Sequence, residues 1–222
     1  MTRHRFAAAC LIVVAGCSGN QQADPGGQVS VDDRSIADAP TPAIKPQTFV
    51  AAGDLCASKG QFDKAAYQYQ QALKTNPKDA PTARKLALAR TKAGRMNEAI
   101  DAWKQYVTAS DGSDDAYGSL GYAYELAAKP SEAESTYQAG ITKHVDGPLC
   151  RVNYGLMLVR KYEVDNAVKQ LSAVLKPAEV NYNIASVYAE LGRKDLAQFY
   201  YKRALQCDPG FIPARQKLAM AD

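Results

Sequence analysis

The chain has 222 residues, of which 46% are hydrophobic and 23% are charged, a balance typical of one globular domain. Its 27 basic residues exceed its 23 acidic residues by four. Residues 1–16 contain two arginines and no acid, so the rest of the chain has 25 basic and 23 acidic residues. A nearly neutral chain lacks the electrostatic signature of a protein that binds nucleic acid or an anionic lipid surface. We therefore expect no nucleic-acid partner.

Residues 1–16 are organised like a bacterial signal peptide. Arg3 and Arg5 precede an apolar run at residues 6–15, which is too short to span a bilayer, since a spanning helix needs about 20 residues. The run ends in the sequence VAGC, whose cysteine is Cys17. This ending resembles the lipobox of bacterial lipoproteins, in which the cysteine is acylated and becomes the new N-terminus. The alternative is an ordinary secretory peptide with an incidental cysteine.

The lipobox resemblance implies a lipid-anchored protein of the cell envelope. Cys17 would carry the lipid, and several acyl chains would hold the protein firmly on a membrane. In a Gram-negative cell, Ser18 in place of an aspartate favours the outer membrane, with the protein facing the periplasm. Residues 17–45 contain several Pro and Gly residues, scattered acids and almost no large apolar side chain. We expect this segment to be a disordered tether that lets the folded part stand off the membrane.

From residue 46 onward the chain repeats with a period of about 34 residues. Each repeat has two small residues twelve positions apart, and a large apolar residue four positions after the second one. The small pairs are Gly53 and Ala65, Ala87 and Ala99, Gly121 and Ala133, Gly155 and Ala167, and Ala185 and Ala197. The large residues are Tyr69, Trp103, Tyr137, Leu171 and Tyr201. This period predicts an all-α chain of helical hairpins, in which the small residues let two helix backbones approach closely.

Five hairpins and one further helix account for the chain after the tether. The hairpins cover residues 46–79, 80–113, 114–147, 148–177 and 178–211, and the fourth is shortened around residues 176–178. Residues 212–221 continue as an eleventh helix. We expect this helix to cap the row, with Arg215 and Gln216 facing outward.

Gly and Pro residues mark the expected helix ends. Gly60, Gly94 and Gly192 fall between paired helices, where a left-handed residue can end the first helix of a hairpin. Pro77 and Pro209 follow second helices, where a missing N–H does no harm. In addition, Ser131 and Glu134 have the spacing of a capping box at the start of a second helix.

These marks together resemble the tetratricopeptide repeat (TPR) over residues 46–222. The fifth hairpin is close to the consensus, with NYNIA at residues 181–185 followed by Gly192, Ala197, Tyr201, Ala204 and Pro209, and the first matches through Gly53, Gly60, Ala65, Ala72 and Pro77. The resemblance implies a right-handed α-solenoid of five helical hairpins plus a C-terminal capping helix. Two local departures are Tyr106, where Ala is usual, and Asp111, where Pro is usual.

In TPR proteins the first helices line a concave groove that binds an extended peptide or a helix, which makes a protein the expected partner. The resemblance places the groove at residues of mixed chemistry with two aromatic anchors, a composition favoured at interfaces. These residues are Arg84, Leu88, Lys92, Tyr122, Glu125, Val152, Leu156, Val159, Arg160, Tyr182 and Glu190. Chaperone-binding TPRs clamp a peptide carboxylate with Lys and Asn, but Val50 and Asp54 stand at those positions, so that clamp is absent. An ordinary helical surface without a ligand is the alternative.

The sequence offers little support for catalysis, a metal site, a cofactor or a small-molecule substrate. No HExxH, GxSxG, GxGxxG or P-loop spacing occurs, and His144 is the one histidine after the signal peptide. We expect it to lie at the end of a second helix and to interact with the unsatisfied carbonyl groups there. The acidic run at residues 111–115 lacks the glutamate that an EF-hand needs, so we expect a turn and a helix N-terminus. We expect Cys56, Cys150 and Cys207 to be small buried apolar residues, with a disulfide or metal role as the alternative.

The sequence therefore predicts a membrane-anchored TPR scaffold that binds a protein partner in the cell envelope. The chain is similar to the TPR lipoproteins of tight-adherence and type IV pilus systems, the latter acting as pilotins that help secretin subunits reach the outer membrane. It resembles more loosely the TPR lipoprotein of the β-barrel assembly machinery. The alternative is a structural envelope lipoprotein that self-associates or links the membrane to the cell wall. Apolar exposure in the groove would favour the first hypothesis, and exposure at the ends or on the convex face the second.

Overall fold

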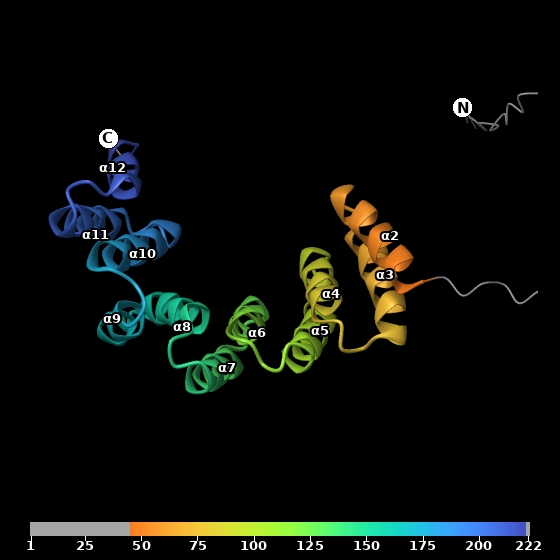
Figure 1. The fold of residues 1–222 in the computed structure, drawn as a ribbon. Helices are drawn as coiled ribbons and strands as arrows, with labels where there is room; N and C mark the ends of the chain where they lie inside the picture. The colour runs from red at the N-terminus through yellow and green to blue at the C-terminus, as the bar shows by residue number, and fades with distance from the viewer. Residues whose placement is uncertain (1–44, 221–222) are drawn as a thin grey trace, which may run out of the picture. The chain divides into compact units, whose positions relative to one another are not determined.

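The computed structural model describes residues 45–220, and every regular element in this part of the chain is an α-helix (Figure 1). The first six helices are α2 (Pro46–Ser58), α3 (Phe62–Thr75), α4 (Ala80–Lys92), α5 (Met96–Ala109), α6 (Asp114–Leu126) and α7 (Pro130–Lys143). The remaining five are α8 (Pro148–Arg160), α9 (Val164–Ser172), α10 (Pro177–Glu190), α11 (Lys194–Cys207) and α12 (Ile212–Ala219). The predicted signal peptide, the lipidation site Cys17 and the tether up to residue 44 lie outside the described residues.

The helices pack pairwise as a TPR solenoid, which confirms the predicted fold class. Each hairpin pairs a first helix with a second: α2 with α3, α4 with α5, α6 with α7, α8 with α9, and α10 with α11. The final helix α12 packs on α11, with Arg215 and Gln216 exposed as expected for a capping helix. Within the described residues, no helix is long and apolar enough to cross a membrane.

The small residues of the repeat accommodate a large side chain from the paired helix. A Cβ atom added to Gly53 would lie 2.4 Å from the ring of Tyr69, and one added to Gly121 would lie 2.3 Å from the ring of Tyr137. At these two positions the close approach is between one backbone and an aromatic ring. The ring needs this space because it is buried at the centre of the hairpin. A Cβ atom at Gly155 would also lie 3.4 Å from the backbone oxygen of Ala167, the approach of two backbones that the sequence suggested.

Left-handed residues end the first helices, as predicted for three of the hairpins. Gly60, Gly94 and Gly192 have φ angles of 71°, 73° and 71°. Ala128 and Tyr162 occupy the same turn in the third and fourth hairpins, with φ angles of 55° and 63°. A side chain in this region is strained, so the fold itself imposes the turn where the sequence lacks glycine.

The predicted capping box at Ser131 and Glu134 does not form. α7 begins at Pro130, and its N-cap residue Lys129 makes no side-chain capping hydrogen bond. Glu134 instead accepts a hydrogen bond of 2.6 Å from the hydroxyl of Tyr154 on the next first helix. The Glu134 carboxylate therefore joins two hairpins. Helix α7 begins at Pro130, since the first turn of a helix tolerates a proline.

The fourth hairpin is shortened in its second helix, as the sequence indicated. α9 has 9 residues, whereas α3, α5, α7 and α11 each have 14. The chain turns after Ser172 and begins α10 at Pro177. The missing turns leave a cleft of about 700 Å³ beside α9, α10 and α11.

The buried apolar residues form two clusters that meet at α6. The N-terminal cluster contains residues of α3, α4 and α5 and three residues of α6, namely Ala116, Leu120 and Ala123. The C-terminal cluster begins with Ala133 and Tyr137 of α7 and continues to α12. Tyr124 of α6 packs against both clusters. Helices α6 and α7 thus form one hairpin but belong to different parts of the core.

Only one of the three cysteines fits the prediction that all are buried. Cys150 is fully buried, whereas Cys56 is half-buried and Cys207 is exposed; all three are free thiols. The prediction is wrong for Cys207, because it is the last residue of α11 and lines the open cleft. Burial raises the pKa of the Cys150 thiol, so this group stays protonated and inert at neutral pH.

Candidate protein-binding groove

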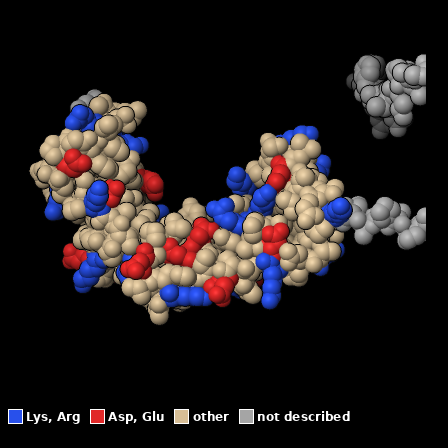
Figure 2. Space-filling model, in the orientation of Figure 1, with Lys and Arg blue, Asp and Glu red and all other residues tan. Residues whose placement is uncertain are grey.

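The first helices α4, α6, α8 and α10 follow one another along the inner side of the bend in Figure 1, and α5, α7, α9 and α11 lie on the outer side. α8 contacts both α6 and α10 directly. Figure 2 shows a hollow on this inner side, with acidic and basic side chains next to one another along its floor. The sequence predicted a groove on these same first helices.

The middle of this surface carries an apolar strip on α6 and α8. Its members are Tyr122, Leu126, Leu149, Val152 and Leu156, which we call the apolar strip. Tyr122 is 47% exposed, Leu126 45% and Leu149 42%. The spacing of four on α6 and of three and four on α8 places each set along one helix face. A cluster of exposed large apolar residues on a concave surface is typical of a binding site.

Gly118 brings the two halves of the apolar strip together. A Cβ atom at Gly118 would lie 3.3 Å from Cβ of Leu149, so the glycine lets α8 approach α6 closely. The amide of Asn153 donates a hydrogen bond of 3.2 Å to the Gly118 carbonyl and fixes this approach. Tyr122 follows Gly118 by one helical turn and is left open to solvent.

Three polar bridges join neighbouring first helices from α2 to α8, and each contains a cation, a carboxylate and a tyrosine hydroxyl. In the first, Asp54 of α2 lies 2.7 Å from Nζ of Lys85 on α4 and accepts a 2.7 Å hydrogen bond from the hydroxyl of Tyr69. The pKa of Asp54 lies below its usual range, chiefly because Lys85 donates a hydrogen bond to it. Burial together with the hydrogen bond to Asp54 raises the pKa of Tyr69, which therefore stays protonated as the donor.

The second bridge explains the departure from the TPR consensus at Tyr106. In this repeat the ring position holds Trp103, whose indole N–H donates to Thr91 at 3.1 Å and to no acid. Tyr106 supplies the hydroxyl instead, donating 2.8 Å to Asp115 of α6, which also accepts from Arg84 of α4 at 3.2 Å. Arg84, predicted as a groove residue, thus stands on this surface with its charge paired.

The third bridge crosses the apolar strip from α6 to α8. Glu125 accepts 2.6 Å from the hydroxyl of Tyr137 and 2.9 Å from the guanidinium of Arg160. The Glu125 side chain is only 14% exposed, and the pKa of Tyr137 is raised by its burial and by this bond. Glu125 and Arg160 were predicted as groove residues that face a ligand. The structure shows that they also bind each other and fix the spacing of α6 and α8.

The predicted groove residues of α4 lie around a smaller hollow at the N-terminal end. Leu88 and Lys92 line a space of about 150 Å³ between α4 and the first hairpin. The ammonium of Lys92 lies 5.3 Å from the centre of the Phe62 ring, a cation–π contact. At this end of the groove, Lys92 is therefore already engaged with the chain's own side chains.

The other predicted groove residues are placed differently by the structure. Val152 and Leu156 are half-buried and pack on the C-terminal cluster. Tyr182 is half-buried against the rings of Tyr201 and Phe211, each with its centre 5.6 Å away, and Glu190 is exposed at the end of α10.

The prediction for Val159 is wrong, because its side chain is 0% exposed and cannot line a surface. α8 contacts α10 directly and is covered on that side. Val159 consequently belongs to the same buried cluster as residues of α10 such as Ile184.

Leu126 and Leu149 belong to the candidate site but were not predicted. The signal was available for Leu126, which stands 34 residues after Lys92 and 34 residues before Arg160, both predicted groove residues. The repeat register therefore places Leu126 on the same surface. Leu149 is in register with Asp115, which was not predicted as a groove residue, so the register gave no such signal for it.

The loop before α6 forms a turn and a helix N-terminus, as the sequence indicated. Asp111 and Gly112 have φ angles of 52° and 64°, and the Ser113 hydroxyl caps α6 by accepting from the Ala116 N–H at 3.3 Å. The His144 ring lies 2.6 Å from the Gly112 carbonyl, so it serves a backbone oxygen of the preceding hairpin. Within residues 45–220, no group of three His, Cys, Asp or Glu residues could hold a metal ion.

Comparisons with known proteins agree with this architecture. Residues 53–92 match a family model described as a TPR repeat, and residues 178–211 match one described as a tetratricopeptide repeat. No curated protein matches the chain in sequence. Several solved structures are similar in fold. The crystal structure of MamA is 27% identical, with 74% of this chain and 92% of that chain covered and a TM-score of 0.57.

Two more distant structures share the fold alone. The structure of PilF from Pseudomonas aeruginosa is 14% identical, covering 79% of this chain and 82% of that chain, with a TM-score of 0.53. YrrB, described as a TPR protein with an unusual peptide-binding site, is 19% identical, covering 77% and 90%, with a TM-score of 0.50. The fold and the two matched repeats are those of TPR scaffolds, a class that binds proteins and is typically not enzymatic.

Proposed function

We propose that the protein is a scaffold whose apolar strip binds an extended peptide or a helix of a partner protein. The observation that carries this proposal is the exposure of Tyr122 and Leu126 on α6 and of Leu149 on α8, two helices that contact each other. The third bridge, Glu125 with Arg160, holds these two helices at a fixed spacing. A rigid apolar floor lowers the entropic cost of binding, because the site is formed before the ligand arrives.

The place of action that we propose is the cell envelope. Its support is the signal-peptide and lipobox pattern of residues 1–17, which implies an acyl anchor on Cys17. A role in the assembly of a pilus or a secretion system is one form of this proposal, supported by the fold shared with PilF. If Cys17 is the anchor, the wild-type protein will incorporate a labelled fatty acid in cells, and the Cys17→Ser variant will not. Equal labelling of the two would refute the anchor.

The groove is tested by comparing partners retrieved from detergent-solubilised envelopes. The bait is the full-length protein, beside a variant carrying Tyr122→Ala and Leu149→Ala. Tyr67→Ala is the matched control, because Tyr67 is 57% exposed on the second helix α3, away from the groove. We expect partners that are lost only with the double variant, and a secretin among them would support the pilus form. Circular dichroism must show equal folding, and identical partner sets for all three baits would refute the groove.

Self-association is a second candidate function, favoured by apolar exposure at the C-terminal end. Ile212 is 61% exposed and Met220 84% exposed. A hollow of about 540 Å³ lies beside Met220 and Tyr182. Sedimentation velocity over a hundredfold range of concentration tests this alternative. A dimer that Met220→Glu dissolves and Tyr122→Ala leaves intact would favour it over the groove.

A further inference from the structure

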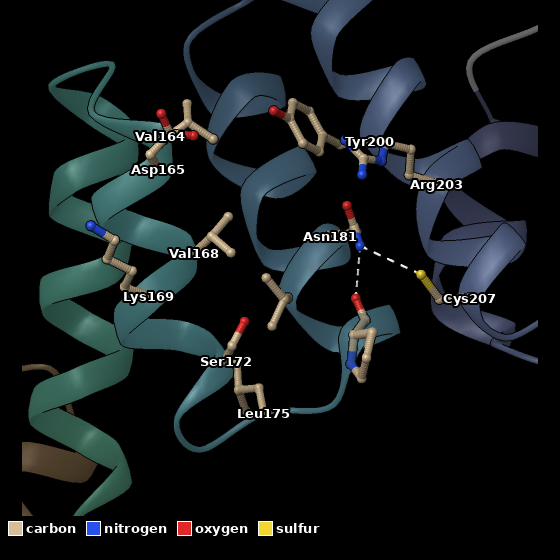
Figure 3. A pocket seen from close by; sticks show the side chains of 12 residues that line it. Val164, Asp165, Val168, Lys169, Ser172, Leu175, Asn181, Tyr200, Arg203 and Cys207 are labelled. Carbon is tan, nitrogen blue, oxygen red and sulfur yellow. Dashed lines mark hydrogen bonds between the residues drawn. The ribbon is translucent and has the colours of Figure 1, made fainter.

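The outer helices α9 and α11 flank a second candidate surface, which is separate from the groove. The cleft left by the short α9 has a volume of about 700 Å³, within the range of ligand-binding pockets. Val164, Val168, Leu175 and Val180 supply much of its apolar lining. Figure 3 shows Val168 pointing from α9 into this cleft, with Tyr200 and Arg203 on the opposite side. Val168 is 37% exposed, so the cleft is open to a partner.

A row of aromatic rings continues from the cleft along α10 and α11. We call it the aromatic row, and it consists of Tyr162, Tyr188, Tyr200 and Phe199. The ring centres of neighbours in this row are 6.4, 5.7 and 5.1 Å apart. Tyr162 and Phe199 are 57% and 52% exposed, although they are the two ends of one packed row. Exposed aromatic side chains of this kind dominate the binding energy of many interfaces.

Cations without acidic partners surround the aromatic row. Arg203 lies over the rings of Phe199 and Tyr200, 5.7 and 6.0 Å from their centres, and Arg193 lies 5.9 Å from the centre of Tyr162. Within the described part of the chain, neither arginine has a carboxylate within 4.0 Å.

The geometry points to an acidic segment of a partner protein as the occupant of this face. We propose that such a segment places a bulky apolar side chain in the cleft and its carboxylates on Arg203 and Arg193. An arginine stacked on a ring still directs its N–H groups outward, where a carboxylate can accept two of them. This second binding surface is additional to the groove and does not depend on it.

Two other occupants fit the observations less well. A second copy of the chain would bring the same two unpaired arginines to a two-fold contact, and like charges repel across such an interface. An anionic lipid headgroup could pair with the arginines, but a flat headgroup layer would leave the apolar cleft beside Val168 unfilled. The acidic peptide satisfies both the charge and the cleft.

The test is a selection of peptides on the full-length protein. A displayed library of random 16-residue peptides is first depleted on a variant carrying Phe199→Ala and Arg203→Ala, which removes peptides that bind elsewhere. The remaining peptides are then selected on the wild-type protein, synthesised with a fluorescent label and measured by anisotropy. We expect peptides rich in Asp and Glu with one large apolar residue, and weaker binding as salt concentration rises.

Single variants decide whether these peptides bind the proposed face. Phe199→Ala and Arg203→Ala should each weaken binding at least tenfold. Tyr67→Ala is the matched control, because Tyr67 is equally exposed at the corresponding position of α3. Tyr67→Ala and the groove variant Tyr122→Ala should leave the affinity unchanged. All four side chains are exposed, and unchanged thermal melting will confirm that each variant folds.

Several outcomes would overturn the proposal. Selection of no peptide, or of peptides without acidic enrichment, would show that the face does not recognise this chemistry. Displacement of the peptides by an equal concentration of dihexanoyl phosphatidylglycerol would assign the face to lipid headgroups. A monomer–dimer equilibrium that Phe199→Ala abolishes, seen by sedimentation, would assign it to a second copy of the chain.

Discussion

Neighbouring first helices are held together differently in the two parts of the molecule. From α2 to α8, each neighbouring pair shares a polar bridge of cation, carboxylate and tyrosine hydroxyl. Among the described residues, no ion pair joins α8 to α10, which meet instead through buried apolar residues such as Val159 and Ile184. Hydrogen bonds are directional, whereas apolar contacts are not. We therefore expect the part from α2 to α8 to hold a fixed groove, and the part beyond it to adjust more easily.

The largest expected effect comes from crowding the ring that takes part in the third bridge. In Gly121→Ala the new methyl group would lie 2.3 Å from the ring of Tyr137, which is fully buried and bonded to Glu125. We expect the free energy of unfolding to fall by about 3 kcal/mol. In Gly155→Ala the contact is 2.7 Å from Leu171, a side chain that can change rotamer. For Gly155→Ala we expect the free energy of unfolding to fall by about 1 kcal/mol.

Urea unfolding followed by circular dichroism measures both variants. The two substitutions gain the same helix propensity, so the difference between them reports the contact alone. Equal losses would contradict the comparison, since they would show that the bridged hairpin is no more rigid than its neighbour.

A smaller effect is expected from removing single hydroxyl groups from the bridges. Tyr137→Phe leaves the 14%-exposed Glu125 without one hydrogen bond, and we expect a loss of about 2 kcal/mol. Tyr69→Phe removes the equivalent bond from Asp54, whose side chain is 49% exposed and can bind water instead. That loss should stay below about 1 kcal/mol. Thermal and urea unfolding of the two variants provide the measurement. A larger loss of stability for Tyr69→Phe than for Tyr137→Phe would show that the burial of the carboxylate does not set the size of the effect.

The smallest effect is the pH dependence of the first bridge. The pKa of Asp54 is depressed in the folded state, so the bridge stabilises the fold at neutral pH and loses this contribution as the pH falls below about 4. The contribution should be under about 1 kcal/mol, because both partners are partly exposed to solvent. Urea titrations at pH 6 and pH 3 should show a smaller loss of stability for Lys85→Met than for the wild type. If the wild type and Lys85→Met lose the same stability between pH 6 and pH 3, carboxylates other than Asp54 are responsible for the loss.

The fold could be predicted from the sequence because the period of 34 depends on local packing within each hairpin. Gly53 with Tyr69 and Gly121 with Tyr137 are such contacts, and each is set by residues sixteen positions apart. The bridges could not be predicted in the same way. Arg84 and Asp115 are 31 residues apart, and their meeting depends on how one hairpin sits on the next.

The repeat register explains which predicted groove residues lie on the surface and which do not. The register locates the exposed face of a first helix, and it led to Tyr122, which is open to solvent. It does not indicate how closely the next first helix packs, and for this reason Val159 was assigned to a surface although it is buried. Tyr182 likewise lies against Phe211, a residue outside the repeat pattern.

The division of the core at α6 has a consequence for recombining these repeats. Ala116, Leu120 and Ala123 of α6 pack with the hairpins before them, whereas Tyr137 of α7 packs with those after it. A chimaera joined between hairpins, at residue 113, would keep α6 with α7 but strip it of the neighbours that bury its other face. A junction inside the third hairpin would instead separate Gly121 from Tyr137. The third hairpin therefore belongs to both parts of the core. Exchanging a hairpin at either end of the solenoid should disturb the packing less than exchanging the third one.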